Sequence, residues 1–419
     1  MTPDQNNDHA AIMFVDVDSK STAAGVVAQA EREGWRWSLV YFRAGSVVRA
    51  RASYKAWEPT ASLKEIEEAL RQTRQLPSGT AANESLDGSP KVSVVIPSTF
   101  ERLQEISECL ESVLASSYRN FEILLVNNRP ENQPELFGVL LDDHVKVLRE
   151  PKRGISAARN HGLNHASGAI VVFTDDDVTV DGLWLERIVV NFVHRPDVVV
   201  ITGLVLPREL VSDAQLWFEL HKGGFGRGYQ RKTYTYPAAS HTRGWVRIED
   251  EVGRIADAAL HVAAGNLGVG ANMAFRTETI RDFNGFDERL GAGLPTYGGE
   301  EILLFAEILL SGGVIAYEPS VLAFHRHRQT SSELDRQLFG QGVGIPVYIS
   351  CLIQRHLWLA PSIFLAKARS MASKVRRPKK SASACVTAET RRYDRQERLG
   401  YRHGIRVGLT LMVSRSRSK

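Results

Sequence analysis

Residues 169–177 read AIVVFTDDD, a short apolar and β-branched run that passes without a spacer into three consecutive aspartates. The apolar run predicts a strand that is buried on both faces, as in a parallel sheet. Ligands of such sheets bind beyond the carboxyl ends of the strands, where these aspartates would lie. Three adjacent carboxylates repel one another, and a hard divalent cation such as Mg²⁺ or Mn²⁺ would remove the repulsion. An acidic turn that caps the next helix is the alternative explanation.

The sequence around this run alternates between predicted strands and predicted helices. Other short apolar runs predict strands at 92–96, 121–126 and 145–148. Apolar residues at helical spacing predict helices at 102–116 and 155–165. Alternation of this kind implies a parallel sheet covered by helices on both faces. We therefore predict an α/β fold with a mostly parallel sheet flanked by helices.

Composition divides the chain into three predicted regions. Residues 1–88 are predicted to form a small N-terminal α/β accessory module that ends in a linker rich in Ser, Gly and Asn. Residues 89–344 hold the alternating pattern and are predicted to form the main domain. Residues 345–419 are predicted to be a basic, amphipathic and partly helical C-terminal region. Within the module, the pattern predicts strands at 11–16 and 37–42 and a helix at 62–74.

The composition excludes several classes of protein. The chain is 43% hydrophobic and 24% charged, and it has no run of ~20 apolar residues such as a membrane-spanning helix needs. Its polar, acidic start lacks the layout of a secretory signal. Cys109, Cys351 and Cys385 are odd in number and far apart, which argues against a disulfide framework and against a structural zinc site. A reducing cytoplasm is the predicted compartment.

The charges are unevenly distributed along the chain. Residues 367–419 hold 16 Lys and Arg against 3 Asp and Glu, whereas the rest of the chain holds 36 against 45. A basic tail attracts anionic lipid or nucleic acid. The mixture of apolar and basic residues at 345–373, which includes Trp358, is typical of an interfacial segment. Because no nucleic-acid-binding motif is present, we expect peripheral contact with an anionic membrane at its cytoplasmic face and no nucleic acid.

Seven segments of the sequence resemble the motifs of family 2 glycosyltransferases, and they occur in the same order as in that family. They are KVSVVIPSTFER, FEILLVNNRP, RGISAARNHGL, GAIVVFTDDDVTVDGLWL, GANMAFR, GFDERLGAG and GGEE, and they fall between residues 91 and 343. Each segment alone is weakly specific, but seven in the same order are strongly specific. The resemblance implies a GT-A fold, a nucleotide-diphosphate sugar donor and inversion at the anomeric carbon.

The resemblance also assigns the donor side of the site. It implies nucleotide-sugar contacts from the strand ends and the loops that follow them: Pro97, Ser98, Thr99, Glu101, Asn127, Arg159, Asp175 and Asp176. Asn127 stands where the family usually has an Asp that reads uracil. An Asn side chain can accept from a ring N–H and also donate, so recognition of a base is expected but the base stays open at this point; a UDP-sugar is the predicted donor by resemblance. Arg159 is implied at the diphosphate, where a guanidinium suits phosphate oxygens. Asp177, Asp175 and His327 are the implied ligands of Mg²⁺ or Mn²⁺.

Glu300 and Glu301 open a predicted helix after two glycines. The helix dipole favours carboxylates there by ~0.3–1 kcal/mol, so capping alone would explain them. The family places its catalytic base in this motif, usually as an Asp in the second position. The resemblance therefore implies that Glu301, one methylene longer, is the base, with Glu300 as the alternative. It also implies acceptor contacts from further residues in this half of the chain: Asn272, Asp287 and Gly299.

Two other functions stay open at this point. A sugar nucleotidylyltransferase also uses a parallel sheet, carboxylates and Mg²⁺, but it needs a loop with glycine and lysine where residues 97–102 read PSTFER. A non-catalytic protein that binds nucleotide sugars is the second alternative, because Asn127 and Glu301 depart from the family's pattern. For a transferase, the acceptor would be a glycan, a lipid-linked sugar or a small molecule with a free hydroxyl.

Overall fold

The structure is a computed structural model of the whole chain. It describes the residues 10–18, 21–34, 37–44, 47–55, 58–75, 88–131, 142–237, 244–366, 368 and 388–416. Three features singled out in the sequence lie wholly or partly outside these residues: the linker at 76–90, the basic tail at 367–419 and Cys385.

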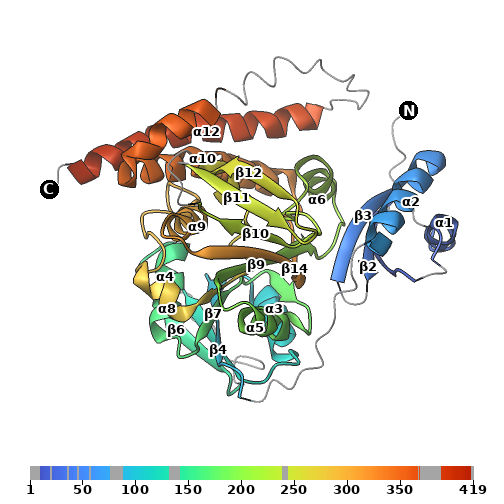
Figure 1. Cartoon of the computed structure of the whole chain (residues 1–419), viewed down its shortest axis with the longest axis horizontal. Coiled ribbons are helices and arrows are strands. Elements are labelled where there is room, and N and C mark those ends of the chain that lie inside the picture. Colours follow the sequence, from blue (N-terminus) through green and yellow to red (C-terminus); the bar gives the residue numbers. More distant parts are fainter. Residues whose placement is uncertain are drawn as a thin grey trace.

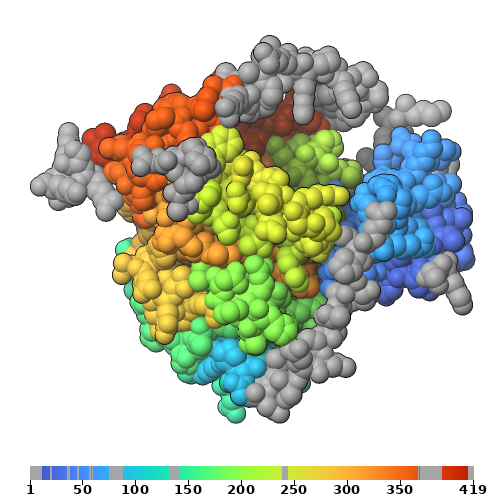
Figure 2. Space-filling view, in the orientation of Figure 1, coloured from blue at the N-terminus to red at the C-terminus, as the bar shows by residue number. Residues whose placement is uncertain are grey.

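The N-terminal module is a small α/β unit, drawn in blue in Figures 1 and 2, where it lies beside the main domain. Its sheet has the order β1-β2-β3, with β1 parallel to β2 and β2 antiparallel to β3. The helices pack their apolar residues on this sheet. The strands and helix predicted here from the sequence are confirmed. The elements are β1 (Ala10–Asp16), α1 (Ala23–Arg32), β2 (Trp37–Ala44), β3 (Val47–Lys55) and α2 (Pro59–Gln75).

A single large sheet forms the main domain, with the order β12-β11-β10-β14-β9-β13-β7-β4-β5-β6 and with β8 paired to β14. Strands β7, β4, β5 and β6 are parallel neighbours, as predicted, whereas the other half of the sheet is mixed. The bounds are β4 (Val92–Ser98), β5 (Phe121–Asn127), β6 (Val145–Arg149), β7 (Ile170–Phe173), β8 (Val178–Val180), β9 (Val198–Pro207), β10 (Lys232–Thr235), β11 (Trp245–Asp250), β12 (Ile255–Ala259), β13 (Met273–Arg276) and β14 (Val314–His325).

Helices cover both faces of the sheet, because the central strands are apolar on both sides. On β4, Val95 belongs to one apolar cluster, whereas Val94 and Ile96 belong to another, since successive side chains point to opposite faces. Helices α4, α7, α9 and α10 pack in the first cluster, and α3 and α5 in the second. The bounds are α3 (Leu103–Leu114), α4 (Ile155–His165), α5 (Trp184–His194), α6 (Asp213–Trp217), η2 (Phe218–Lys222), α7 (Leu260–Ala264), α8 (Thr277–Asp282), α9 (Glu300–Leu310), α10 (Ser331–Arg355), η4 (Leu357–Leu359) and α12 (Ala388–Ser416). The predicted α/β fold class is confirmed.

Helices α10 and α12 lie against each other along the top of the molecule in Figure 1. Their backbones approach closely because glycines line the contact: a Cβ on Gly342 would overlap the backbone oxygen of Glu397, and one on Gly400 would overlap that of Phe339. Helix α10 also continues through residue 345, so the predicted domain boundary at 344/345 falls inside a helix.

No single helix among the described residues meets the length and hydropathy expected of a membrane span. Helix α10 and the segment Leu357–Ala366 meet these criteria only as a pair, and they are bent by 119° relative to each other.

Candidate active site

The three aspartates lie at the carboxyl edge of the sheet, directly after β7. Ser98 and Asn127 are register partners at the ends of β4 and β5, so they share this edge. The Ser98 hydroxyl donates to Asp176 Oδ2 at 2.6 Å. Thr99 and Glu101 follow in the loop after β4, where Thr99 is half-buried and Glu101 exposed. Because parallel strands end at one edge, short local patterns were enough to predict this grouping.

Cationic side chains surround Asp176 and Asp177. Arg102 donates to Asp176 Oδ1 at 2.6 Å and to Asp177 Oδ2 at 2.8 Å, and Arg328 lies 3.5 Å from Asp177 Oδ2. Although burial opposes ionisation, His325, Arg102 and Arg328 hold the pKa of Asp177 at about 2. Burial raises the pKa of Asp176 to about 6 despite Arg102. Arg102 therefore supplies positive charge where the sequence analysis expected only a cation from solution.

His325, and not His327, is the histidine beside the aspartates. Its Nε2 lies 3.4 Å from Asp177 Oδ1, whereas His327 Nε2 lies 2.9 Å from Glu219 Oε1. The prediction that His327 lies at the aspartates is therefore wrong, because the structure places His325 there and His327 at Glu219. His325 and His327 are two residues apart on an extended segment, so their side chains point to the same side of the backbone. Only His325 reaches the edge of the sheet where the aspartates lie.

Asp177 and His325 fit a divalent cation. Burial lowers the pKa of His325 to about 4, so its ring is neutral at pH 7 and carries a nitrogen lone pair. A carboxylate oxygen with an imidazole nitrogen suits Mn²⁺, and such ions complete their shell with water and substrate phosphates. Over the described part of the chain, no three His, Cys, Asp or Glu side chains are grouped as a protein-only metal site would require.

Arg159 joins the aspartates to the helix that carries the glutamates. Its Nη2 donates to Asp175 Oδ1 at 3.1 Å and to the Gly270 oxygen at 3.3 Å, and its Nη1 donates to Glu300 Oε1 at 2.9 Å. Arg159 is 1% exposed, and both terminal nitrogens of its guanidinium bind protein atoms. Arg159 thus bridges Asp175 and Glu300 and lines the main cavity, and its contact with a diphosphate stays a prediction.

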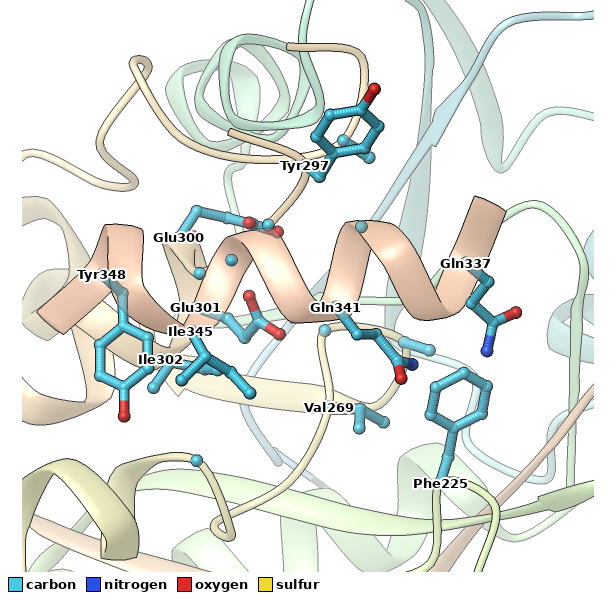
Figure 3. A pocket seen from close by; sticks show the side chains of 18 of the residues that line it. Phe225, Val269, Tyr297, Glu300, Glu301, Ile302, Gln337, Gln341, Ile345 and Tyr348 are labelled. Atoms are coloured by element: carbon cyan, nitrogen blue, oxygen red, sulfur yellow. The ribbon is translucent and has the colours of Figure 1, made fainter. Parts of the chain in front are cut away.

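A cavity of about 920 Å³ opens beside this bridge, and Asp175, Arg159, Glu300 and Glu301 all line it. Figure 3 shows the Glu301 carboxylate facing this space, which the α10 side chains Gln341 and Ile345 also face. Burial, followed by the charge of Glu300, raises the pKa of Glu301 to about 8. A half-buried carboxylate that holds a proton this tightly, at the wall of a cavity, has the properties of a general base.

Gly299, predicted as an acceptor contact, lines the cavity and is the N-cap residue directly before α9, with a positive φ of 93°. A Cβ there would come within 3.0 Å of Tyr348 Cβ and 3.1 Å of the Gly344 oxygen on α10. This glycine therefore allows α9 and α10 to approach closely, with Glu300 and Glu301 at the start of α9.

Two other predicted acceptor contacts lie elsewhere. Asn272 is buried in the sheet, where its amide donates to the oxygens of Leu204 and Val321 and its Oδ1 accepts from Trp184 Nε1. Asp287 is paired with Arg289 and Arg355 beside a separate cavity of about 410 Å³. Both predictions are corrected, because these side chains are engaged by protein groups away from the main cavity.

Arg227 is a cavity residue that the sequence analysis did not identify. It lines the cavity, and burial lowers its pKa despite the nearby Glu301. Arg102, at the aspartates, was also missed. The sequence signal for Arg227 was its position in the glycine- and aromatic-rich stretch that follows Phe225. The sequence signal for Arg102 was its position directly after Glu101. A single arginine in a loop has no spacing pattern, so only the folded structure identifies it.

The family model described as Glycosyl transferase family 2 matches residues 93–251. A glucosyl-dolichyl phosphate glucuronosyltransferase of Haloferax volcanii is 36% identical over 158 residues, which is 35% of this chain and 50% of the relative. A pre-mycofactocin glycosyltransferase of Mycobacterium tuberculosis is 26% identical over 241 residues, which is 56% of this chain and 44% of the relative. The matched segments thus span half or less of these curated relatives.

One solved structure with a detectable likeness is the mannosyltransferase PcManGT from Pyrobaculum calidifontis, in complex with GDP-Man and Mn²⁺. It has a TM-score of 0.41 and 17% identity, and the match covers 76% of this chain and 86% of that chain.

Proposed function

We propose that this chain, which carries a family 2 glycosyltransferase domain at residues 93–251, transfers a sugar from a nucleotide-diphosphate donor to an acceptor hydroxyl with inversion. One observation carries the proposal: Asp175 at the sheet edge and the two glutamates at the start of α9 line one cavity. Asp175 and Glu300 bind opposite ends of the same guanidinium, that of Arg159, and Glu301 faces the same space. A leaving-group site and a base are thus brought together in one cavity.

In the proposed reaction, Glu301 takes the proton of the acceptor hydroxyl. The hydroxyl oxygen forms a bond to the anomeric carbon as the bond from that carbon to the diphosphate oxygen breaks. The leaving nucleoside diphosphate carries away the electron pair, and a single displacement inverts the configuration. General-base assistance of this kind contributes ~10²–10⁴-fold.

We propose that Asp177 and His325, with Asp175 nearby, hold Mg²⁺ or Mn²⁺ together with the donor. When bound, the cation would supply positive charge to the diphosphate oxygens. Arg102 and Arg328, which contact Asp177, are placed to turn towards the phosphates once the carboxylate has another partner. Guanidinium groups pair well with phosphate oxygens.

For the base of the donor we propose uracil, read from the ends of β4 and β5. Pro97, Ser98, Thr99 and Asn127 surround the edge at which a nucleotide would meet the sheet. This position agrees with the general rule that ligands of parallel sheets bind beyond the carboxyl ends of the strands. Glu101, in the same loop, is proposed to contact the nucleotide as well.

We propose that the acceptor is a lipid-linked sugar presented at the cytoplasmic face of an anionic membrane. Apolar side chains from α7, α9 and α10 line the cavity near Glu301: Val262, Ile302, Ile345 and Ile349. Exposed apolar side chains also occur after α10 and on α12: Leu357, Trp358, Phe364, Leu365, Ile405, Leu409 and Val413. Arginines such as Arg398 and Arg402 are exposed on the same side of α12 by helical spacing, as in an interfacial helix. The name of the Haloferax relative, which includes dolichyl phosphate, is consistent with this choice.

For the chain as a whole we propose an accessory module at residues 1–88, followed by the catalytic domain. Because α10 lines the cavity, we assign this helix to the catalytic domain.

The test is release of nucleoside diphosphate from a panel of UDP-, GDP- and dTDP-sugars, with and without Mn²⁺ and with candidate acceptors. Transfer that needs Mn²⁺ and is lost in Glu301→Gln, with donor binding retained, is the expected result. If no donor in the panel is turned over by the wild-type protein while a nucleotide sugar still binds, the chain is a binding protein and the proposal fails.

A further inference from the structure

A continuous chain of polar contacts runs from the N-terminal module to the aspartates. Arg51 on β3 donates from Nη1 to Glu219 Oε2 at 2.9 Å, and the other oxygen of Glu219 lies 2.9 Å from His327 Nε2. The Nδ1 atoms of His327 and His325 are 3.2 Å apart, and His325 Nε2 lies 3.4 Å from Asp177 Oδ1. These five residues are called the relay below. It links the N-terminal module to the main domain, two parts of the chain that no local sequence pattern connects.

The relay is enclosed by packed side chains. Glu219 and His327 are each 2% exposed. Phe218 packs edge-on against His327, and Phe225 packs against both histidine rings. Gly224, with a φ of 59°, leaves the space that Glu219 Oε1 fills, because a Cβ there would overlap this oxygen. The rings and the carboxylate are therefore held in one arrangement.

The order of hydrogens along the relay follows from the chemistry of its members. The Glu219 carboxylate accepts from Arg51, and it also accepts from His327, so His327 carries a hydrogen on Nε2; in the tautomer with that hydrogen alone, the other ring nitrogen has none. His327 Nδ1 is then an acceptor, and the hydrogen between the two Nδ1 atoms belongs to His325. This assignment leaves His325 Nε2 without a hydrogen. Two acceptor atoms, His325 Nε2 and Asp177 Oδ1, consequently face each other, which is the arrangement that a cation requires.

We infer that Arg51 is a positioning residue for the donor site: through Glu219 and His327 it fixes the tautomer in which His325 presents its Nε2 lone pair beside Asp177. The inference rests on the proposed function, because it concerns the cation that the donor brings. It gives the N-terminal module a role, since the module supplies the first member of the relay. Groups that orient a metal-binding histidine through its second nitrogen typically change metal affinity 10–100-fold when they are removed.

The experiment compares Arg51→Gln with Arg49→Gln in the full-length protein. Both arginines lie on β3 and both pair with a carboxylate of the main domain, but Arg49 pairs with Glu251, which is outside the relay. Mn²⁺ affinity is measured by electron paramagnetic resonance of the free ion, with Mn²⁺ alone and with UDP present. We expect Arg51→Gln to weaken Mn²⁺ binding about tenfold, Arg51→Lys to restore part of the loss, and Arg49→Gln to bind within twofold of the wild type. Equal affinities in Arg51→Gln and Arg49→Gln overturn the inference.

Two further measurements cover the case in which Arg51→Gln does not fold. His327→Phe changes the relay inside the main domain and is expected to weaken Mn²⁺ binding at least tenfold; wild-type affinity in this variant overturns the inference. Long-range ¹H–¹⁵N correlation spectra of the metal-free wild-type protein report the tautomer directly. Hydrogen on Nδ1 of His325 supports the relay, and hydrogen on Nε2 overturns it. Sugar transfer by the wild-type protein is scored separately, so the relay can fail while the proposed function stands.

Discussion

The substitution Glu301→Gln isolates the proposed base, because it keeps the size of the side chain and removes its ability to accept a proton. Burial and the neighbouring Glu300 raise the pKa of Glu301 to about 8. At pH 7 only about one tenth of the free enzyme then carries the ionised carboxylate. A base acts in its ionised form, so kcat/KM should rise about tenfold between pH 7 and a plateau above pH 9. In Glu301→Gln we expect a ~10²–10⁴-fold loss at the plateau, or ~3–5 kcal/mol in the barrier, and no rise near pH 8.

The assay is initial-rate release of nucleoside diphosphate at low donor concentration, because kcat/KM reports the ionisation of the free enzyme. Glu307→Gln is the matched control: Glu307 lies on the same helix, but it pairs with Arg355 and His356 and lines the separate cavity. This control should retain the rise near pH 8. A Glu301→Gln enzyme with the wild-type pH profile would refute the assignment of the base, and loss of donor binding in this variant would indicate a structural role.

Other predictions concern the aspartates, the helix contact and the membrane. Asp177→Asn should nearly abolish turnover and weaken Mn²⁺ binding in calorimetric titrations, because it removes a charged ligand; undiminished, Mn²⁺-dependent turnover would contradict this. Gly342→Ala should lower the free energy of unfolding by ~1–3 kcal/mol in urea titrations, since its Cβ would overlap the Glu397 backbone. Gly182→Ala, whose Cβ meets no atom within 4 Å, should be nearly neutral by comparison. Arg398→Glu combined with Arg402→Glu should reduce flotation of the full-length protein with anionic vesicles severalfold; unchanged flotation of this double variant would remove the membrane proposal.

Local patterns in the sequence were sufficient for the four parallel strands β4, β5, β6 and β7 of the main sheet and for the edge at which they end. The run before Asp175 predicts a buried strand, and the strands that end at Ser98 and Asn127 lie in register with each other. Apolar periodicity is a property of neighbours in the chain, so it is present in the sequence before folding. The same reasoning led to Glu300 and Glu301, because a helix start has a local signature.

Only the tertiary structure decided the partners of the polar side chains. Arg159 pairs with Glu300 across 141 positions, and Arg51 pairs with Glu219 across 168. His325 and His327 look equivalent in the sequence, yet one lies at Asp177 and the other at Glu219. Asn272 resembles a ligand contact in the sequence, although its amide satisfies strand and Trp184 groups in the core. Hydrogen bonds are short-ranged and directional, so their partners are determined by the packing of distant elements, which no local pattern in the chain records.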